Sequence, residues 1–234
     1  GIYTVDLESG RGGMIISIEQ MSAWDARIKP PPSALQWFNH LLCSPGGKRF
    51  AFLHRWSEEE GRGRRSTRLC TADFDGRDIR IIYEGELFSH FYWRDATRIL
   101  GWANRPEAGS AFYLFDEESK SAAPVGIEEM PHDGHCSYIP GTNWILNDGY
   151  PSGEDRSQPL YLYNPQLQQR IELGAFYAPP AYSGEWRCDL HPRRSRNGRF
   201  VSIDSTHGGN GRQIYLLDIS GLALGCAVKA GRTP

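Results

Sequence analysis

The sequence of 234 residues lacks a long apolar segment and has few cysteines. No apolar run approaches the ~20 residues of a membrane-spanning helix, and no charged-then-apolar leader opens the chain. We therefore predict no membrane partner. The five cysteines are odd in number and form no Cys-x-x-Cys pair. This argues against a disulfide framework and weakly favours a reducing, cytoplasmic compartment over the periplasm.

The sequence also lacks a large excess of positive or negative charge, since its net charge is −2. Such a chain has no general attraction for nucleic acid, so we predict no nucleic-acid partner. The local basic cluster Arg62, Arg64 and Arg65 lies among glycines and is typical of a solvated loop. Nothing in the sequence indicates an oligomeric state.

Helical periodicity is scarce, with one short candidate between Gln20 and Leu42. The 12% of aromatic residues and the 26 glycines are instead typical of a β-rich protein with many tight turns. A short aromatic and aliphatic strand ending in Asp or Asn recurs along the chain. Its copies are Ile2–Asp6, Arg68–Asp73, Phe112–Asp116, Leu160–Asn164 and Ile214–Asp218.

A second repeated feature is a histidine that opens a strand-like segment. Four of the seven histidines hold this place, at intervals of 50, 45 and 56 residues: His40, His90, His135 and His191. Each is followed by a turn sequence and a further apolar strand. The predicted strands are Arg49–Leu53, Ile99–Trp102, Trp144–Leu146 and Phe200–Ile203.

Each unit of about 45 to 55 residues therefore contains four antiparallel strands, which is the pattern of a β-propeller blade. We predict an all-β fold, with residues 1–234 forming one propeller domain. It has about four complete blades, and the first 19 residues supply two outer strands of another. The count favours part of a six- or seven-bladed ring over a closed five-bladed ring with one incomplete blade.

In a propeller, the start of each first strand and the end of each second strand lie on the same face. This rule predicts that the repeated histidines gather near the central channel. Imidazoles are good ligands for Zn²⁺ or Mn²⁺. We predict a divalent metal site with His90, His135, His191 and Cys188 as ligands, and no organic cofactor. The alternative is that the histidines only cap the channel.

The segment Gly134-His135-Cys136, the pair His191-Pro192 and the stretch Asn210–Leu216 resemble the propellers of oligogalacturonate lyases. They are also similar to propeller-type ulvan lyases. The resemblance extends from about Asn39 to Ser220, although the strand and turn signatures are shared with TolB-like propellers that have no enzymatic function.

The resemblance implies a carbon–oxygen lyase that cleaves uronate-containing oligo- or polysaccharides by β-elimination. It implies that His135 and His191 bind the metal, and that His90 lies at a further site position. One departure concerns Arg193, which stands where the family has a second histidine. A second is Cys188, near the position of an amide ligand. With these two departures, the metal site implied by the resemblance is altered, shifted toward a ligand set that includes cysteine, or lost.

Catalysis of β-elimination needs a neutralised carboxylate, a base and an acid. From their placement on one face, we predict that Arg55 neutralises the carboxylate and that His54 or Tyr150 transfers protons. His40 is a further catalytic candidate. Two other functions remain open: a non-catalytic, TolB-like binding module, and a hydrolase-associated or lactonase-like propeller.

Overall fold

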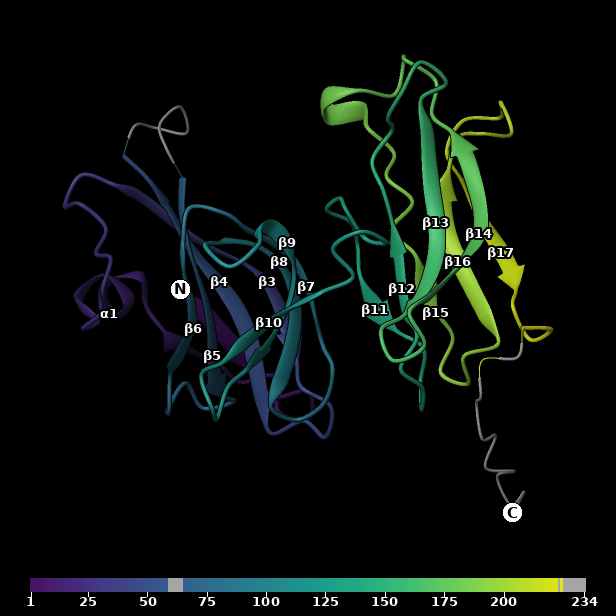
Figure 1. Cartoon of the computed structure of the whole chain (residues 1–234). Helices are drawn as coiled ribbons and strands as arrows, with labels where there is room; N and C mark the ends of the chain where they lie inside the picture. The colour runs from purple at the N-terminus through teal and green to yellow at the C-terminus, as the bar shows by residue number, and fades with distance from the viewer. Residues whose placement is uncertain (59–64, 223, 225–234) are drawn as a thin grey trace. The chain divides into compact units, whose positions relative to one another are not determined.

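The structure is a computed structural model that describes residues 1–58, 65–222 and 224 (Figure 1). Arg62, Arg64 and Cys226, which the sequence analysis considered, lie outside these residues. The chain divides into two compact units. Unit 1 contains Gly1–Ser89 and Trp93–Ala123, and unit 2 contains His90–Tyr92 and the chain from Pro124 onward. Each unit is described by itself.

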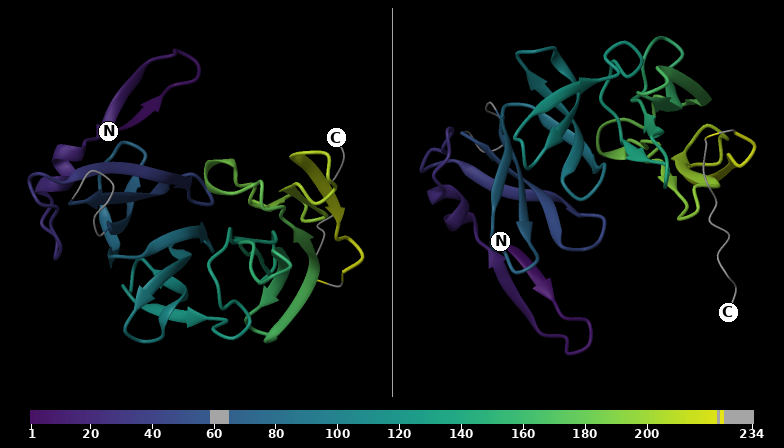
Figure 2. Two further views of the ribbon diagram at one scale, coloured as in Figure 1. Left: turned by 90° about the horizontal axis from the view of Figure 1, so that it is seen from above. Right: turned by 60° about the horizontal axis from the view of Figure 1, so that its bottom comes forward.

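Unit 1 begins with a hairpin of two antiparallel strands, β1 (Ile2–Val5) and β2 (Gly12–Ile16), which Figure 2 shows joined by a tight loop. Helix α1 (Ile18–Ala23) follows, and its first turn is capped by the Ser17 hydroxyl, which accepts a hydrogen bond of 2.9 Å from the Gln20 amide. The brief helical periodicity predicted between Gln20 and Leu42 corresponds to this helix only as far as Ala23. Three prolines, residues 30–32, separate the helix from the next strand, because proline cannot continue a hydrogen-bonded helix.

The first four-stranded sheet has the order β3-β4-β5-β6. Its strands are β3 (Leu35–Cys43), β4 (Arg49–Ser57), β5 (Arg65–Asp73) and β6 (Arg80–Gly85). The second four-stranded sheet has the order β10-β9-β8-β7. Its strands are β7 (Phe88–Trp93), β8 (Arg98–Arg105), β9 (Gly109–Asp116) and β10 (Ala122–Val125).

Unit 2 contains a third four-stranded sheet, in the order β11-β12-β13-β14. Its strands are β11 (Ser137–Tyr138), β12 (Ile145–Asp148), β13 (Ser157–Asn164) and β14 (Gln169–Tyr177). After a single 3₁₀ turn, η1 (Gly184–Trp186), the last sheet has the order β15-β16-β17. Its strands are β15 (Arg193–Arg194), β16 (Phe200–Ser205) and β17 (Gln213–Asp218).

Sequential antiparallel sheets of this kind are the blades of a β-propeller, and the predicted fold class is confirmed. The predicted turns do connect β3 to β4, β7 to β8, β11 to β12 and β15 to β16. The fourth blade differs from the prediction, because only three strands form it among the described residues. No helix in the described part of the chain is both long enough and apolar enough to span a bilayer.

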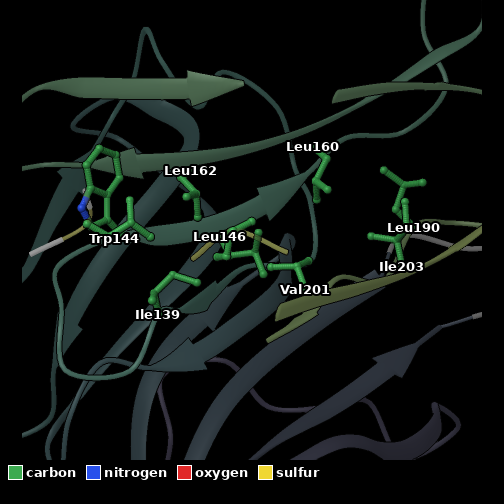
Figure 3. Packing of buried hydrophobic residues seen from close by; sticks show 10 residues of the cluster. Ile139, Trp144, Leu146, Leu160, Leu162, Leu190, Val201 and Ile203 are labelled. Carbon is green, nitrogen blue, oxygen red and sulfur yellow. The ribbon is translucent and has the colours of Figure 1, made fainter. Parts of the chain in front are cut away.

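Apolar side chains from successive blades fill the space between them. In unit 2, Leu146 of β12, Leu160 of β13 and Val201 of β16 are completely buried in one cluster with Leu190 (Figure 3). Burying a side chain of this size stabilises a fold by roughly 1.5–3 kcal/mol. Leu190 immediately precedes His191, so the packing of the core also holds the backbone that carries this histidine.

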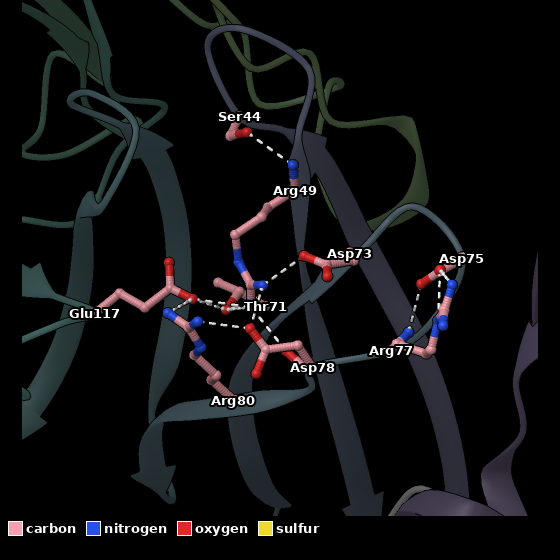
Figure 4. Close-up of polar contacts among 9 residues, drawn as sticks. All are labelled: Ser44, Arg49, Thr71, Asp73, Asp75, Arg77, Asp78, Arg80 and Glu117. Atoms are coloured by element: carbon pink, nitrogen blue, oxygen red, sulfur yellow. Dashed lines mark hydrogen bonds and ion pairs between the residues drawn. The ribbon is translucent and has the colours of Figure 1, made fainter.

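A polar network joins the two blades of unit 1. The buried carboxylate of Glu117 accepts a 2.7 Å hydrogen bond from Thr71 and lies 2.9 Å from a guanidinium nitrogen of Arg49 (Figure 4). Arg80 lies 3.2 Å from the same carboxylate oxygen. A buried charge is tolerated only where such partners compensate its desolvation, so we assign these residues to stability.

Candidate metal and proton-transfer site

The four repeated histidines do not occupy the same place in their strands. His135 and His191 each come two residues before the first strand of a blade, whereas His90 is the third residue of β7. His40 lies inside β3, where the pairing with β4 shifts register. His40 and His191 also have positive φ angles of 54° and 42°. The repeat therefore places His90, His135 and His191 near strand starts, but not His40, and the local backbone decides how each imidazole is presented.

Three of the histidines lie together in unit 2. The ring of His135 is 4.2 Å from that of His90 and 3.9 Å from that of His191, between centroids. Among the described residues, one group of side chains has the spacing of a metal site: His135, Asp189 and His191, whose ligand atoms lie within 4.8 Å of one another. His90 is adjacent to this group without being part of it.

The Nδ1 atoms of both histidines in this group face oxygen acceptors. His135 Nδ1 lies 3.0 Å from the carboxylate of buried Asp148, and the same carboxylate accepts a 2.6 Å hydrogen bond from the His135 amide. His191 Nδ1 lies 3.3 Å from the Asp189 carbonyl oxygen. Carbonyl and carboxylate oxygens only accept, so each Nδ1 carries the proton and Nε2 presents its lone pair.

Gly134 explains how His135 reaches Asp148. A Cβ at this position would lie 2.1 Å from the carbonyl oxygen of Asp148 and 2.9 Å from the side-chain oxygen of Asn147. Only glycine lets the chain approach β12 this closely. The Gly-His pair seen in the sequence is therefore a local requirement of the site.

Burial disfavours a charge on His191. Its pKa is lowered mainly by burial and further by the neighbouring imidazole of His135. The neutral form is the one that binds metals. The two imidazoles and one carboxylate can hold a divalent ion through nitrogen and oxygen donors.

A second chain of polar contacts runs beside this group. His90 Nδ1 lies 3.0 Å from the carboxylate of Asp133, and the Tyr150 hydroxyl lies 3.5 Å from His90 Nε2. Burial, together with the carboxylates of Asp133 and Asp189, raises the pKa of Tyr150 well above its usual range. Tyr150 therefore keeps its proton at neutral pH.

An open pocket of about 660 Å³ adjoins the metal group. Asp189 and His191 line it, as do Arg187, Cys188 and Arg212. The pocket is wide enough to admit a sugar-sized ligand and brings two guanidinium groups next to the candidate metal ligands.

Of the four ligands predicted from the sequence, His135 and His191 belong to the group with metal-site spacing. Cys188 lies one residue from its third member, Asp189. Burial raises the pKa of the Cys188 thiol, which opposes the thiolate form that binds metals. Arg193 is exposed and offers no ligand atom. His90 and Cys188 as ligands remain predictions.

The predicted catalytic residues lie in different units. Tyr150 belongs to unit 2, whereas His40, His54 and Arg55 belong to unit 1. His54 is fully buried in β4, with Nε2 3.0 Å from Gln36 Oε1 and Nδ1 3.4 Å from a guanidinium nitrogen of Arg68.

Arg55 is also buried, and it donates a 2.7 Å hydrogen bond to the Phe88 carbonyl. His40 is exposed. The catalytic roles of these unit 1 residues stay predictions, and they take no part in the geometry described above.

Three carboxylates of the site were not assigned from the sequence: Asp133, Asp148 and Asp189. Asp189 and Asp148 do lie at the strand starts and strand ends where the propeller rule gathers polar side chains. For Asp133, the only indication of a role in the sequence was the nearby His135. A carboxylate near a histidine is common in any sequence, so only the contacts identify these partners.

Comparison of the sequence with known protein families found no match, and comparison with curated proteins found none either. The structure resembles an oligogalacturonate lyase in complex with manganese, with a TM-score of 0.60 and 13% identity, covering 92% of this chain and 55% of that one. It resembles tricorn protease with the same TM-score of 0.60 and 14% identity, covering 93% of this chain and 23% of that one.

A third similar structure is the β-propeller domain of the trilobed protease from Pyrococcus furiosus. Its TM-score is 0.51 at 14% identity, covering 78% of this chain and 56% of that one. The chain thus spans about half the length of the lyase, 55%, and less of tricorn protease. At these identities the comparisons establish the propeller fold, and lyases and proteases share it.

Proposed function

We propose that unit 2 binds a divalent metal ion through His135, Asp189 and His191, and that the chain is a lyase acting on uronate-containing glycans. The observation that carries the metal site is the pairing of both Nδ1 atoms with oxygen acceptors. Metal-binding histidines in proteins are usually held in this way, with Nε2 directed to the metal.

The donor set suits Mn²⁺ or Zn²⁺, and a carboxylate among the ligands favours the harder ion, Mn²⁺. The similar oligogalacturonate lyase is a manganese complex, which supports the same choice. In a lyase, a bound divalent ion would neutralise the uronate carboxylate and so acidify the neighbouring C–H bond. Asp189 and His191 line the pocket where such a sugar would lie.

The residues beside the metal group supply the proton chemistry of β-elimination. Asp133 orients His90 through Nδ1, which leaves Nε2 as the basic atom on the side of Tyr150. We assign His90 to removal of the C5 proton. Tyr150, which is protonated at neutral pH, donates a proton to the leaving O4 oxygen.

The proposal is tested by two measurements on the full chain. Metal content is determined for the protein and for His135→Ala and His191→Ala, with exposed His207→Ala as the matched control. Polygalacturonate, ulvan and related uronates are then incubated with the Mn²⁺-loaded protein, and the ultraviolet absorbance of the unsaturated product is followed with and without chelator. We expect loss of metal in the first two variants only, and an absorbance rise that chelator stops.

A non-catalytic binding propeller is the second candidate. The chain is as similar in structure to tricorn protease as to the lyase, and Arg193 replaces a ligand expected from the lyase resemblance. Binding of uronate oligosaccharides with no product from any of them would support this function and exclude the lyase.

A further inference from the structure

Arg187 makes two contacts at the edge of the candidate metal group. Its Nε atom lies 2.6 Å from Oδ1 of Asp189, and its guanidinium carbon lies 4.9 Å from the ring centre of Tyr150. The Arg187 side chain is 50% exposed, whereas that of Asp189 is only 7% exposed. A half-exposed cation is therefore paired with a mostly buried carboxylate, and both residues line the pocket.

A buried carboxylate needs a compensating positive charge. Two cations compete for that role at Asp189, since the carboxylate is paired with Arg187 and is also part of the group that could hold a divalent ion. A metal ion on Asp189 would repel the guanidinium and remove most of its attraction to the carboxylate. Binding the metal therefore has to weaken the contact with Arg187.

The position of Arg187 lets its side chain move without unfolding a strand. It directly follows the 3₁₀ turn η1, and its amide donates a 3.3 Å hydrogen bond to the Gly184 carbonyl. Arg212 holds the same turn by donating to the Trp186 carbonyl. The backbone of the turn is thus held in place while the Arg187 guanidinium faces the pocket.

Resting on the proposed function, we infer that Arg187 is the resident counter-ion of Asp189 and is exchanged for the divalent ion when the metal binds. Its guanidinium then turns to the pocket and binds the carboxylate of an acidic sugar. The planar fork of arginine matches a carboxylate with two parallel hydrogen bonds. Arg187 in this way couples metal binding to recognition of an acidic substrate and acts as a specificity-determining residue.

The test is a calorimetric titration of metal-free protein with Mn²⁺. Arg187→Gln removes the competing cation, so we expect about tenfold tighter Mn²⁺ binding, equivalent to ~1.4 kcal/mol. Arg199→Gln removes an exposed guanidinium of the same unit that is paired with Asp218 and contacts neither Asp189 nor the η1 turn, and we expect a change of less than about threefold. In an Asp189→Asn background, Arg187→Gln should have no further effect.

A second titration measures binding of a digalacturonate to the Mn²⁺-loaded proteins. Arg187→Gln should weaken digalacturonate binding about tenfold or more. Arg187→Lys keeps the charge but not the planar fork, so its affinity should lie between those of the unchanged protein and Arg187→Gln. Unchanged or weaker Mn²⁺ binding in Arg187→Gln would overturn the exchange. If His135→Ala binds Mn²⁺ normally, the metal site itself is wrong. Loss of Mn²⁺ binding in His135→Ala without tightening in Arg187→Gln would leave the proposed function standing and reject only the role of Arg187.

Discussion

Unit 1 and unit 2 both hold histidines beside polar or charged groups, fully buried in unit 1 and partly buried in unit 2, and the surroundings differ. His54 is fully buried between an amide and the guanidinium of Arg68, and its pKa is lowered to about 4 by burial and by that cation. His135 and His191 are neighbours, contact carboxylate or carbonyl oxygens and lie at or beside an open pocket. The partners of a histidine therefore tell more about its role than its place in the repeat.

The comparison also separates two uses of buried charge. In unit 1, Glu117 directly follows β9 of the second blade and is paired with Arg49 and Arg80 of the first blade. In unit 2, Asp189 has one half-exposed arginine and two imidazoles near it. The first arrangement compensates a charge permanently. The second leaves room for exchange, which is the property that a ligand site needs.

The largest expected effect of a single substitution is on turnover. Tyr150→Phe removes the proposed proton donor while keeping the ring beneath Arg187, so kcat on a uronate substrate should fall by about 10²- to 10⁴-fold. Mn²⁺ affinity should remain within about twofold, since Tyr150 is outside the metal group. Steady-state kinetics and calorimetry measure the two quantities separately. A kcat close to that of the unchanged protein would remove Tyr150 from the mechanism.

The network of unit 1 gives the largest effect on stability. Glu117→Gln leaves two arginines without their buried carboxylate, so the free energy of unfolding should fall by about 3 kcal/mol. Denaturant unfolding followed by tryptophan fluorescence measures this change. The surface pair offers a matched control, because Asp218→Asn also removes an acid paired with arginine but should have a much smaller effect, since solvent screens the exposed pair. Equal effects would show that the Glu117 network adds nothing to stability.

Substitution of Asp148 tests, through the Mn²⁺ affinity, whether His135 in unit 2 is a metal ligand. Asp148→Asn replaces the carboxylate that orients His135 with an amide, so Mn²⁺ binding should weaken about 10- to 100-fold. Asn keeps the size of the side chain, and His54→Gln in unit 1 is the control that should leave Mn²⁺ affinity unchanged. Affinity that does not respond to Asp148→Asn would mean that His135 is not a ligand.

The last expected effect is a pH dependence of stability from His54. Because its pKa is about 4 in the folded chain and 6.5 as an ordinary value, the unfolded chain takes up the proton first as the pH falls. The free energy of unfolding should therefore decrease by up to about 1.4 kcal/mol per pH unit between pH 6.5 and 4. Unfolding measured across this pH range should show the slope for the unchanged protein and for the exposed control His207→Gln. His54→Gln should lack it. Parallel curves for all three proteins would contradict the neutral, buried His54.

Much of the fold followed from local patterns. Strands that end in Asp or Asn before a turn, such as Leu160–Asn164, repeat because a hairpin needs both an apolar strand and a turn residue. The regions predicted as strands were found as strands, and helix α1 ends at Ala23, before the prolines at 30–32 are reached. His135 and His191 were recognisable because they recur at one place in the repeat and carry the Gly-His and His-Pro motifs.

The partners of these histidines could not be read in the same way. Asp189 rather than Cys188 completes the group with metal-site spacing, although the two are neighbours in the chain. The sequence places both near the strand start, and only the backbone direction decides which side chain faces His135. For the same reason, His54 looked accessible at a strand end but lies in the core beside Arg68.

The sequence by itself determined the class of fold and pointed to the region of the candidate site, because turn residues, strand alternation and repeat length are local and act through a few neighbouring residues. Tertiary structure alone decided which carboxylate meets which imidazole, which histidine is buried and where Arg187 lies. These depend on contacts between residues up to 60 positions apart, such as that of Tyr150 with His90, and no local pattern encodes them.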